Sequence, residues 1–119
     1  MSISNSDKQE ILRLLLVMKQ RAHDLEISLR FKGQNGEADQ IAQNTKKLSD
    51  KIDILLGQVM IDWLSEAATI LQKINQANNS LQSSIQEIQD GVRTAQNVVK
   101  AIGYIDDALA IAAKVAATL

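Results

Sequence analysis

The feature that most constrains this chain is a run of apolar residues spaced three and four positions apart. Such steps keep side chains on one face of an α-helix. The residues between them are mostly glutamine, asparagine and serine, with few charges, so the segment can bury one face and must expose the other to water. A helix of this kind needs a partner helix. The apolar positions are 67, 70, 74, 77, 81, 85, 88, 92, 95, 99 and 102.

The composition of the chain also favours helices. The 119 residues include no proline and five glycines, and 45% of them are hydrophobic while only 3% are aromatic. The apolar content is therefore mostly aliphatic and alanine, which suits helix packing better than a sheet. A chain of this length usually forms one domain. We expect residues 1–119 to fold as a single helical-bundle domain.

The pattern predicts an all-α fold, an antiparallel helical bundle of three long helices with coiled-coil-like packing. The first helix is expected at about 7–32, because Ser6 and Gln9 fit a capping box and apolar residues follow at helical spacing. The two glycines within 33–36 predict a tight turn after it. A second turn is predicted at 78–80, where Asn-Asn-Ser caps or turns helices better than it continues them.

The third predicted helix carries an unbroken heptad seam as far as Ile102. Trp63 is expected inside the second helix, where two consecutive four-residue steps open space for a large core residue. Together these residues are the candidate core or interaction face of the bundle. They are Trp63, Leu81, Ile85, Ile88, Val92, Val99 and Ile102.

A break is expected near Gly103 in the third helix. A continued heptad rhythm would bury the carboxylate of Asp106, which is costly without a partner. Gly103 can end a helix in the left-handed conformation, and aspartate is a strong N-cap. We therefore predict a short fourth helix that begins at Asp106. A continuous helix in which Asp106 makes a polar contact is the alternative.

No residue pattern in the sequence indicates a catalytic, metal or cofactor site. His23 is the only histidine, and cysteine is absent. Adjacent carboxylates could serve acid–base chemistry only in a cleft that shifts their pKa, whereas helix surfaces carry such pairs routinely. We expect no catalytic residue, metal or cofactor, and a protein that is not an enzyme. The carboxylate pairs are Asp62 with Glu66, Glu87 with Asp90, and Asp106 with Asp107.

The charge balance and hydropathy limit the kinds of partner. Thirteen basic and fourteen acidic residues give a formal net charge of -1, without the basic surplus of a nucleic-acid binder. The most hydrophobic window, 98–119, carries four charges and is not expected to span a bilayer, although it could touch a membrane surface. The N-terminal residues lack the features of a signal peptide. A cytoplasmic location is the expectation, with leaderless secretion as the alternative.

The leading functional expectation is a non-enzymatic helical interaction or assembly module. Such a module would form a homo-oligomer or bind a helical protein partner. The amide-rich face of the third predicted helix, which begins at about 81, supports this expectation, because charged residues oppose burial at an interface more than Gln, Asn and Ser do. The alternative is a leaderless exported helical protein, such as a secretion-system substrate or a subunit of a membrane-acting toxin, suggested by the alanine-rich C-terminal segment.

Overall fold

The computed structural model describes residues 3–60, 62–63 and 67–117, and within these ranges the chain contains helices and no strand. The described elements are α1 (Asn5–Phe31), α2 (Asn35–Gly57), α3 (Ala67–Gln89) and α4 (Thr94–Ala117). The predicted all-α helical bundle is therefore confirmed. The prediction of three long helices was wrong, because these residues form four helices of 23 to 27 residues each.

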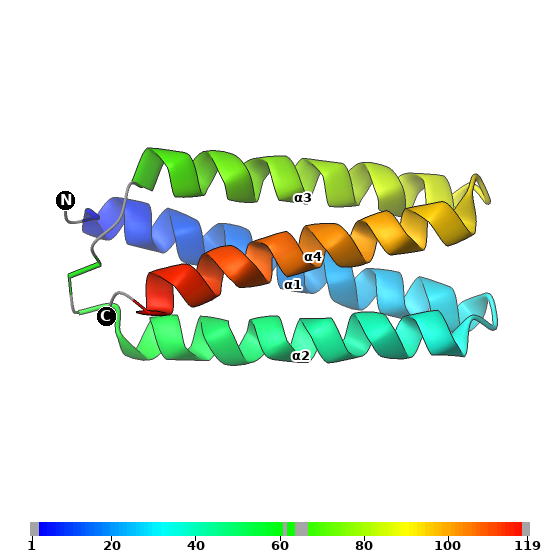
Figure 1. Cartoon of the computed structure of the whole chain (residues 1–119), viewed down its shortest axis with the longest axis horizontal. Coiled ribbons are helices and arrows are strands. Elements are labelled where there is room, and N and C mark those ends of the chain that lie inside the picture. The colour runs from blue at the N-terminus through cyan, green and yellow to red at the C-terminus, as the bar shows by residue number, and fades with distance from the viewer. Residues whose placement is uncertain (1–2, 61, 64–66, 118–119) are drawn as a thin grey trace.

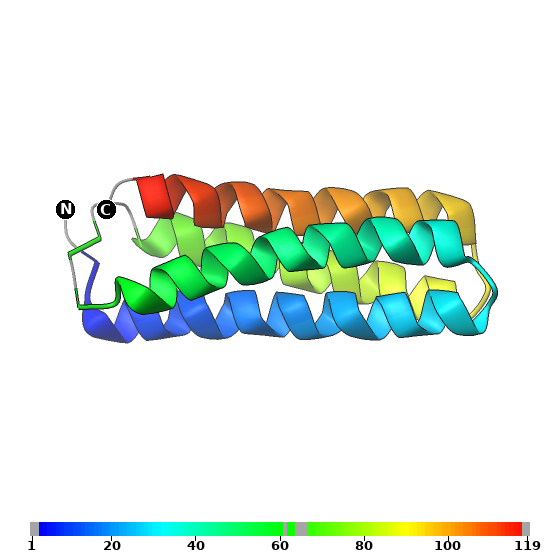
Figure 2. The same cartoon turned by 90° about the horizontal axis from the view of Figure 1, so that it is seen from below.

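The four helices form two antiparallel hairpins that pack side by side (Figure 1). The first hairpin is α1 with α2, and the second is α3 with α4. Between the hairpins, α1 packs on α3 and α2 packs on α4, so that α2 and α3 lie on the diagonal of the bundle. Figure 2 shows that both hairpin turns lie at the same end, opposite the start of α1 and the end of α4. Neighbouring helices of different hairpins consequently run parallel.

Each hairpin turn contains a glycine in the left-handed conformation. Gly33 has φ of +76° and Gly91 has φ of +75°, values that cost a glycine little and other residues more. Each glycine N–H donates to the carbonyl three residues earlier, and the next N–H donates to the carbonyl five residues before itself. This is the hydrogen-bond pattern of a Schellman motif. The predicted turn at 33–36 is confirmed, and the matching turn at Gly91 was not predicted.

The start of α1 differs from the prediction by two residues. Ser4, not Ser6, is the N-cap, and its Oγ accepts a hydrogen bond of 3.1 Å from the backbone N–H of Asp7. Asp7 also places a carboxylate in the first turn, where the helix dipole favours an acid. Position 6 lies inside the helix and is exposed. The three-residue spacing of the predicted capping box, Ser6 to Gln9, is therefore found two residues earlier, from Ser4 to Asp7.

The second reversal of the chain lies after Gly57, and the predicted turn at 78–80 was wrong. Trp63 belongs to this connection rather than to a helix, and it is fully buried at the end of the bundle. Its indole N–H donates to the carbonyl of Gln58 at 3.0 Å, and its own carbonyl accepts from the N–H of Ile3 at 2.8 Å. The Lys8 Nζ lies 5.6 Å from the centre of the indole ring.

The third predicted helix is also corrected. The turn at Gly91 divides the expected seam between α3 and α4, and the predicted break near Gly103 does not occur, because Gly103 lies within α4. Asp106 does not cap a helix. It is exposed, and its Oδ1 accepts a hydrogen bond of 3.0 Å from the side-chain amide of Asn44 on α2. The alternative, a continuous helix with a polar contact at Asp106, is the arrangement observed.

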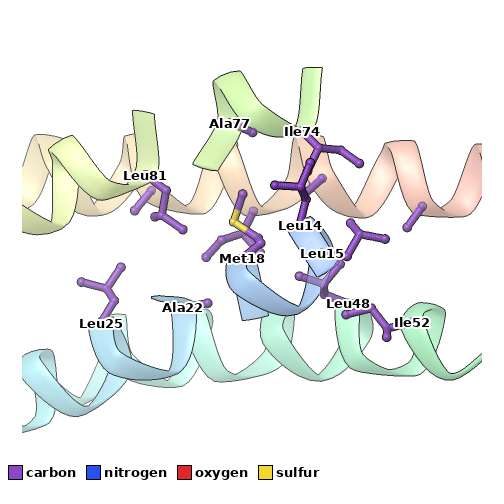
Figure 3. Close-up of a cluster of buried hydrophobic side chains, with 14 of the residues drawn as sticks. Leu14, Leu15, Met18, Ala22, Leu25, Leu48, Ile52, Ile74, Ala77 and Leu81 are labelled. Carbon is purple, nitrogen blue, oxygen red and sulfur yellow. The ribbon is translucent and has the colours of Figure 1, made fainter. Parts of the chain in front are cut away.

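The core of the bundle is aliphatic along most of its length. Figure 3 shows Leu15 and Met18 of α1 between Leu48 of α2 and the apolar side chains of α3. These three side chains are fully buried, and each buried side chain of this size stabilises the fold by roughly 1.5 to 3 kcal/mol. Because every helix buries one stripe, every helix also presents one outer face to solvent.

Candidate interaction surface

The predicted core or interaction residues do not share one face. Trp63, Leu81, Ile85 and Ile88 are buried in the core. Ile102 is partly buried and packs against the core. The remaining two face solvent: Val92 in the turn after α3 is 44% exposed, and Val99 on α4 is 70% exposed.

The outer face of α3 is almost uncharged. Lys73 and Glu87 are the two charged residues among the 23 of this helix, whereas the equally long α2 carries seven. We call the exposed residues of α3 the amide face, since glutamine and asparagine dominate it. They are Ala68, Thr69, Gln72, Lys73, Asn75, Gln76, Asn79, Gln82, Ser83, Gln86, Glu87 and Gln89.

A groove runs beside the amide face, between α3 and α4. Its volume is about 430 Å³. Its lining combines apolar and polar side chains, and the two charges in it have opposite signs and stand on opposite helices. The half-buried Tyr104 is the aromatic residue of the lining. The lining is Lys73, Gln76, Ala77 and Ser80 from α3, with Tyr104, Asp107, Ala110 and Ile111 from α4.

A buried amide on the inner side of α3 fixes which way the helix faces. Asn78 is 3% exposed, and its side-chain Nδ2 donates to the carbonyl of Leu14 on α1 at 3.0 Å. The guanidinium of Arg21 donates to the backbone carbonyl of Asn78 at 2.9 Å. A rotation of α3 would leave the buried side-chain amide of Asn78 without a partner, which costs about 1 to 3 kcal/mol. The amide face is thereby held outward.

Two further contacts hold the second hairpin in place. Lys32, at the end of α1, donates from Nζ to the carbonyl of Ile88 at 2.8 Å, in the last turn of α3, where the helix dipole favours a cation. The buried amide of Asn97 donates to the carboxylate of Glu87 at 2.7 Å and to the carbonyl of Val92 at 3.0 Å. The hairpin is therefore tied both to α1 and across its own turn.

The outer face of α1 also exposes apolar side chains, but it is different in character. Leu16 is 43% exposed, Ile27 is 42% exposed and Phe31, at the helix end, is 89% exposed. Exposed charged and polar residues separate them, including Asp24 beside His23. Single exposed apolar residues are normal on protein surfaces. The outer face of α1 is thus a mixed surface, whereas the amide face is nearly free of charge.

The other candidate residues are dispersed over the surface. His23 is exposed on α1, and Asp106 and Asp107 are exposed on α4. Glu66, one member of a predicted carboxylate pair, lies outside the described residues. In the part of the chain that the structure describes, no three His, Cys, Asp or Glu residues are grouped so as to hold a metal ion.

None of the described helices is long and apolar enough to cross a membrane. The apolar residues of 98–119 that the structure describes lie mostly on the inner side of α4. Val98, Ile105 and Val115 are buried in the core, while Val99 is the large apolar residue of this segment that faces solvent. The apolar side of α4 is therefore used to build the bundle.

No protein-family model, curated protein or solved structure matches this chain in the comparisons made. The class that the fold defines is a four-helix bundle of two hairpins with one nearly uncharged outer face.

The amide-rich face was predicted on a helix that begins at about 81, whereas the amide face of the structure lies on α3, and the groove was not predicted. Tyr104 and Asp107 were expected near a helix break. In the structure they lie one turn apart on α4 and line the groove together. The signal for the correct helix boundary was the pair Asp90-Gly91, a common helix-ending sequence that the continuing apolar rhythm concealed.

Proposed function

We propose that this protein is a non-enzymatic helical assembly module that associates with a second copy of itself, or with a helical partner, through the amide face and the adjoining groove. The observation that carries the proposal is the difference between the outer faces of α2 and α3. Both helices have 23 residues, of which seven are charged in α2 and two in α3.

This difference bears on association because of desolvation. Burying a charged side chain at an interface requires a partner of opposite charge, and without one the group loses its hydration at high cost. Amides and hydroxyls can instead form hydrogen bonds across an interface, and charged residues are depleted at the centres of interfaces. Lysine and glutamate otherwise give an exposed helix solubility and pairing energy at little cost. Their scarcity on α3 therefore favours a face that is covered by another protein.

The available area is sufficient for a stable contact. The bundle measures 45 by 22 by 17 Å along its principal axes. A standard protein interface covers about 800 Å² on each partner. The long side of the bundle that includes α3 is of this size, and Tyr104 in the groove supplies the kind of aromatic anchor that interfaces favour.

The test places carboxylates on the amide face without altering side-chain shape. Gln72→Glu with Gln76→Glu adds two charges at the sixth and tenth of the 23 residues of α3, away from the last turn, where the helix dipole would oppose an acid. Sedimentation equilibrium of the wild-type protein should show a dimer or larger species. The doubly substituted protein should associate about tenfold more weakly or worse, a change of at least about 1.4 kcal/mol.

A matched control is available on α2. Gln40 and Gln43 are exposed, and they occupy nearly the same positions relative to the start of their helix. Gln40→Glu with Gln43→Glu makes the same chemical change on the charged outer face and should leave association unchanged. Equal weakening by both variants would point to net charge rather than to the amide face. A wild-type monomer at high micromolar concentration would contradict self-association.

A further inference from the structure

The groove between α3 and α4 carries the charge pattern of a self-complementary surface. Lys73 stands on the α3 wall and Asp107 on the α4 wall, and both are exposed. The ion pairs between described residues lie elsewhere, at Arg13 with Glu10 and at Arg30 with Glu26 and Asp39. The two groove charges are thus of opposite sign, on opposite walls, and directed to a shared surface.

We propose that this groove is the two-fold interface of a homodimer, in which Lys73 of each copy pairs with Asp107 of the other. The inference rests on the proposed function and names its occupant, a second copy of this chain. A two-fold axis that runs along the groove places α3 of one copy opposite α4 of the other. Each copy then contributes one cation and one anion, so the interface contains two identical ion pairs, as an isologous contact requires.

The spacing of the lining residues fits this arrangement. The α3 wall uses positions 73, 76, 77 and 80, and the α4 wall uses 104, 107, 110 and 111, so both walls are stripes of about two helical turns. Because α3 and α4 are antiparallel and Asn97 of α4 contacts Glu87 of α3, Asp107 lies about level with Ala77, one turn from Lys73. One turn is about 5.4 Å along the axis, which the flexible stem of a lysine can span.

The remaining lining suits close contact between two copies. Ala77, Ser80 and Ala110 are small and let a neighbouring helix approach. Tyr104 is half-buried and offers a ring and a hydroxyl to the partner. An interface of this composition has an apolar centre with polar groups around it, the usual anatomy of a protein–protein contact.

The test uses charge reversal in two separate chains. Lys73→Asp gives a groove with two carboxylates, and Asp107→Lys gives a groove with two ammonium groups. In a two-fold dimer each substituted chain meets only like charges, and association should weaken by more than about tenfold. An equimolar mixture of the two should recover dimerisation close to that of the wild type, because every Asp then faces a Lys. Sedimentation equilibrium measures the affinities, and native mass spectrometry identifies the heterodimer.

The controls separate this inference from the proposed function. Lys47→Asp and Asp50→Lys make the same changes on the exposed face of α2, and neither should alter dimerisation. A wild-type dimer that both groove variants leave intact would overturn the groove as the interface and leave self-association standing. A mixture no tighter than either single variant would also overturn the pairing. A wild-type protein that stays monomeric would overturn the groove dimer together with self-association. Thermal melts by circular dichroism establish that each variant is folded.

Discussion

The side-chain amide of Asn78 and the backbone carbonyl of Leu14 are joined by a hydrogen bond of 3.0 Å between two parallel helices, α3 and α1. Asn78 lies at the midpoint of α3 and is 97% buried, as its 3% exposure shows. The hydrogen bonding of the Asn78 side chain is incomplete, because its Oδ1 is buried and has no hydrogen-bond partner in the described structure. One polar residue therefore sets the position of α3 at some cost in stability.

Asn78→Leu tests this cost. Leucine has the same number of side-chain heavy atoms, branched at the same carbon, and removes an unsatisfied carbonyl. Replacing a buried polar group by a well-packed apolar one is often neutral or stabilising. We expect the free energy of unfolding in urea to stay within about 1 kcal/mol of wild type or to rise. Asn78→Asp should instead lose several kcal/mol, because it buries a carboxylate against a carbonyl. A loss above about 3 kcal/mol for Asn78→Leu would mean that the hydrogen bond itself stabilises the bundle.

Two glycines give predictions of opposite sign. Gly91→Ala forces alanine into a left-handed conformation, which should cost about 1 to 2 kcal/mol. Gly103→Ala adds a methyl group within α4 where nothing lies within 4 Å, and it should stabilise by about 0.5 to 1 kcal/mol through helix propensity. Denaturant unfolding at low protein concentration measures both. Destabilisation by Gly103→Ala would restore the helix break that the sequence suggested.

A buried and an exposed residue should differ sharply in their effect on stability. Ile88 is fully buried in the last turns of α3, and Ile88→Ala should cost about 2 to 5 kcal/mol. His23 is exposed, and His23→Ala should change stability by no more than about 0.5 kcal/mol. The comparison uses the midpoint of urea unfolding at constant slope. Similar effects of the two substitutions would contradict the assignment of Ile88 to the core.

The carboxylate of Glu10 provides a prediction about pH. A hydrogen bond and the charge of Arg13 hold the pKa of Glu10 below its ordinary value. Because the folded-state pKa is depressed, the stabilisation is present above the unfolded-state pKa and is lost as pH falls through the folded value. In an NMR titration the Glu10 side chain should titrate at lower pH than in Arg13→Gln. Identical titration curves would show that the pair does not persist in solution.

Features that depend on neighbouring residues could be predicted from the sequence, whereas features that depend on contacts between distant residues could not. The first helix and the turn at Gly33 were predictable because capping residues and glycine act locally. The turn at 78–80 was predicted from local preference. In the structure, however, the side-chain amide of Asn78 donates a hydrogen bond to the carbonyl of Leu14, 64 residues away. Tertiary hydrogen bonding reversed the local tendency of the segment.

The turn of the second hairpin was missed because the apolar spacing continues without interruption across it. Ile88 and Val92 continue a four-residue apolar step across Gly91, so the heptad rhythm gave no sign that the chain turns. After the turn, the buried stripe of α4 begins at Val98 and Ala101. The predicted seam had instead used positions 95, 99 and 102. The charge-poor face of α3 was visible in the sequence. The groove beside it depends on the pairing of α3 with α4.

The most direct measurement of the central claim is a concentration series of ¹H–¹⁵N NMR spectra of the wild-type protein. If the amide face and the groove mediate association, signals of Gln76, Tyr104 and their neighbours on α3 and α4 should shift or broaden as concentration rises. Signals from the outer face of α1, such as Leu16 and Ile27, should remain unchanged. Shifts confined to α1, or spectra independent of concentration up to the millimolar range, would contradict assembly through this surface.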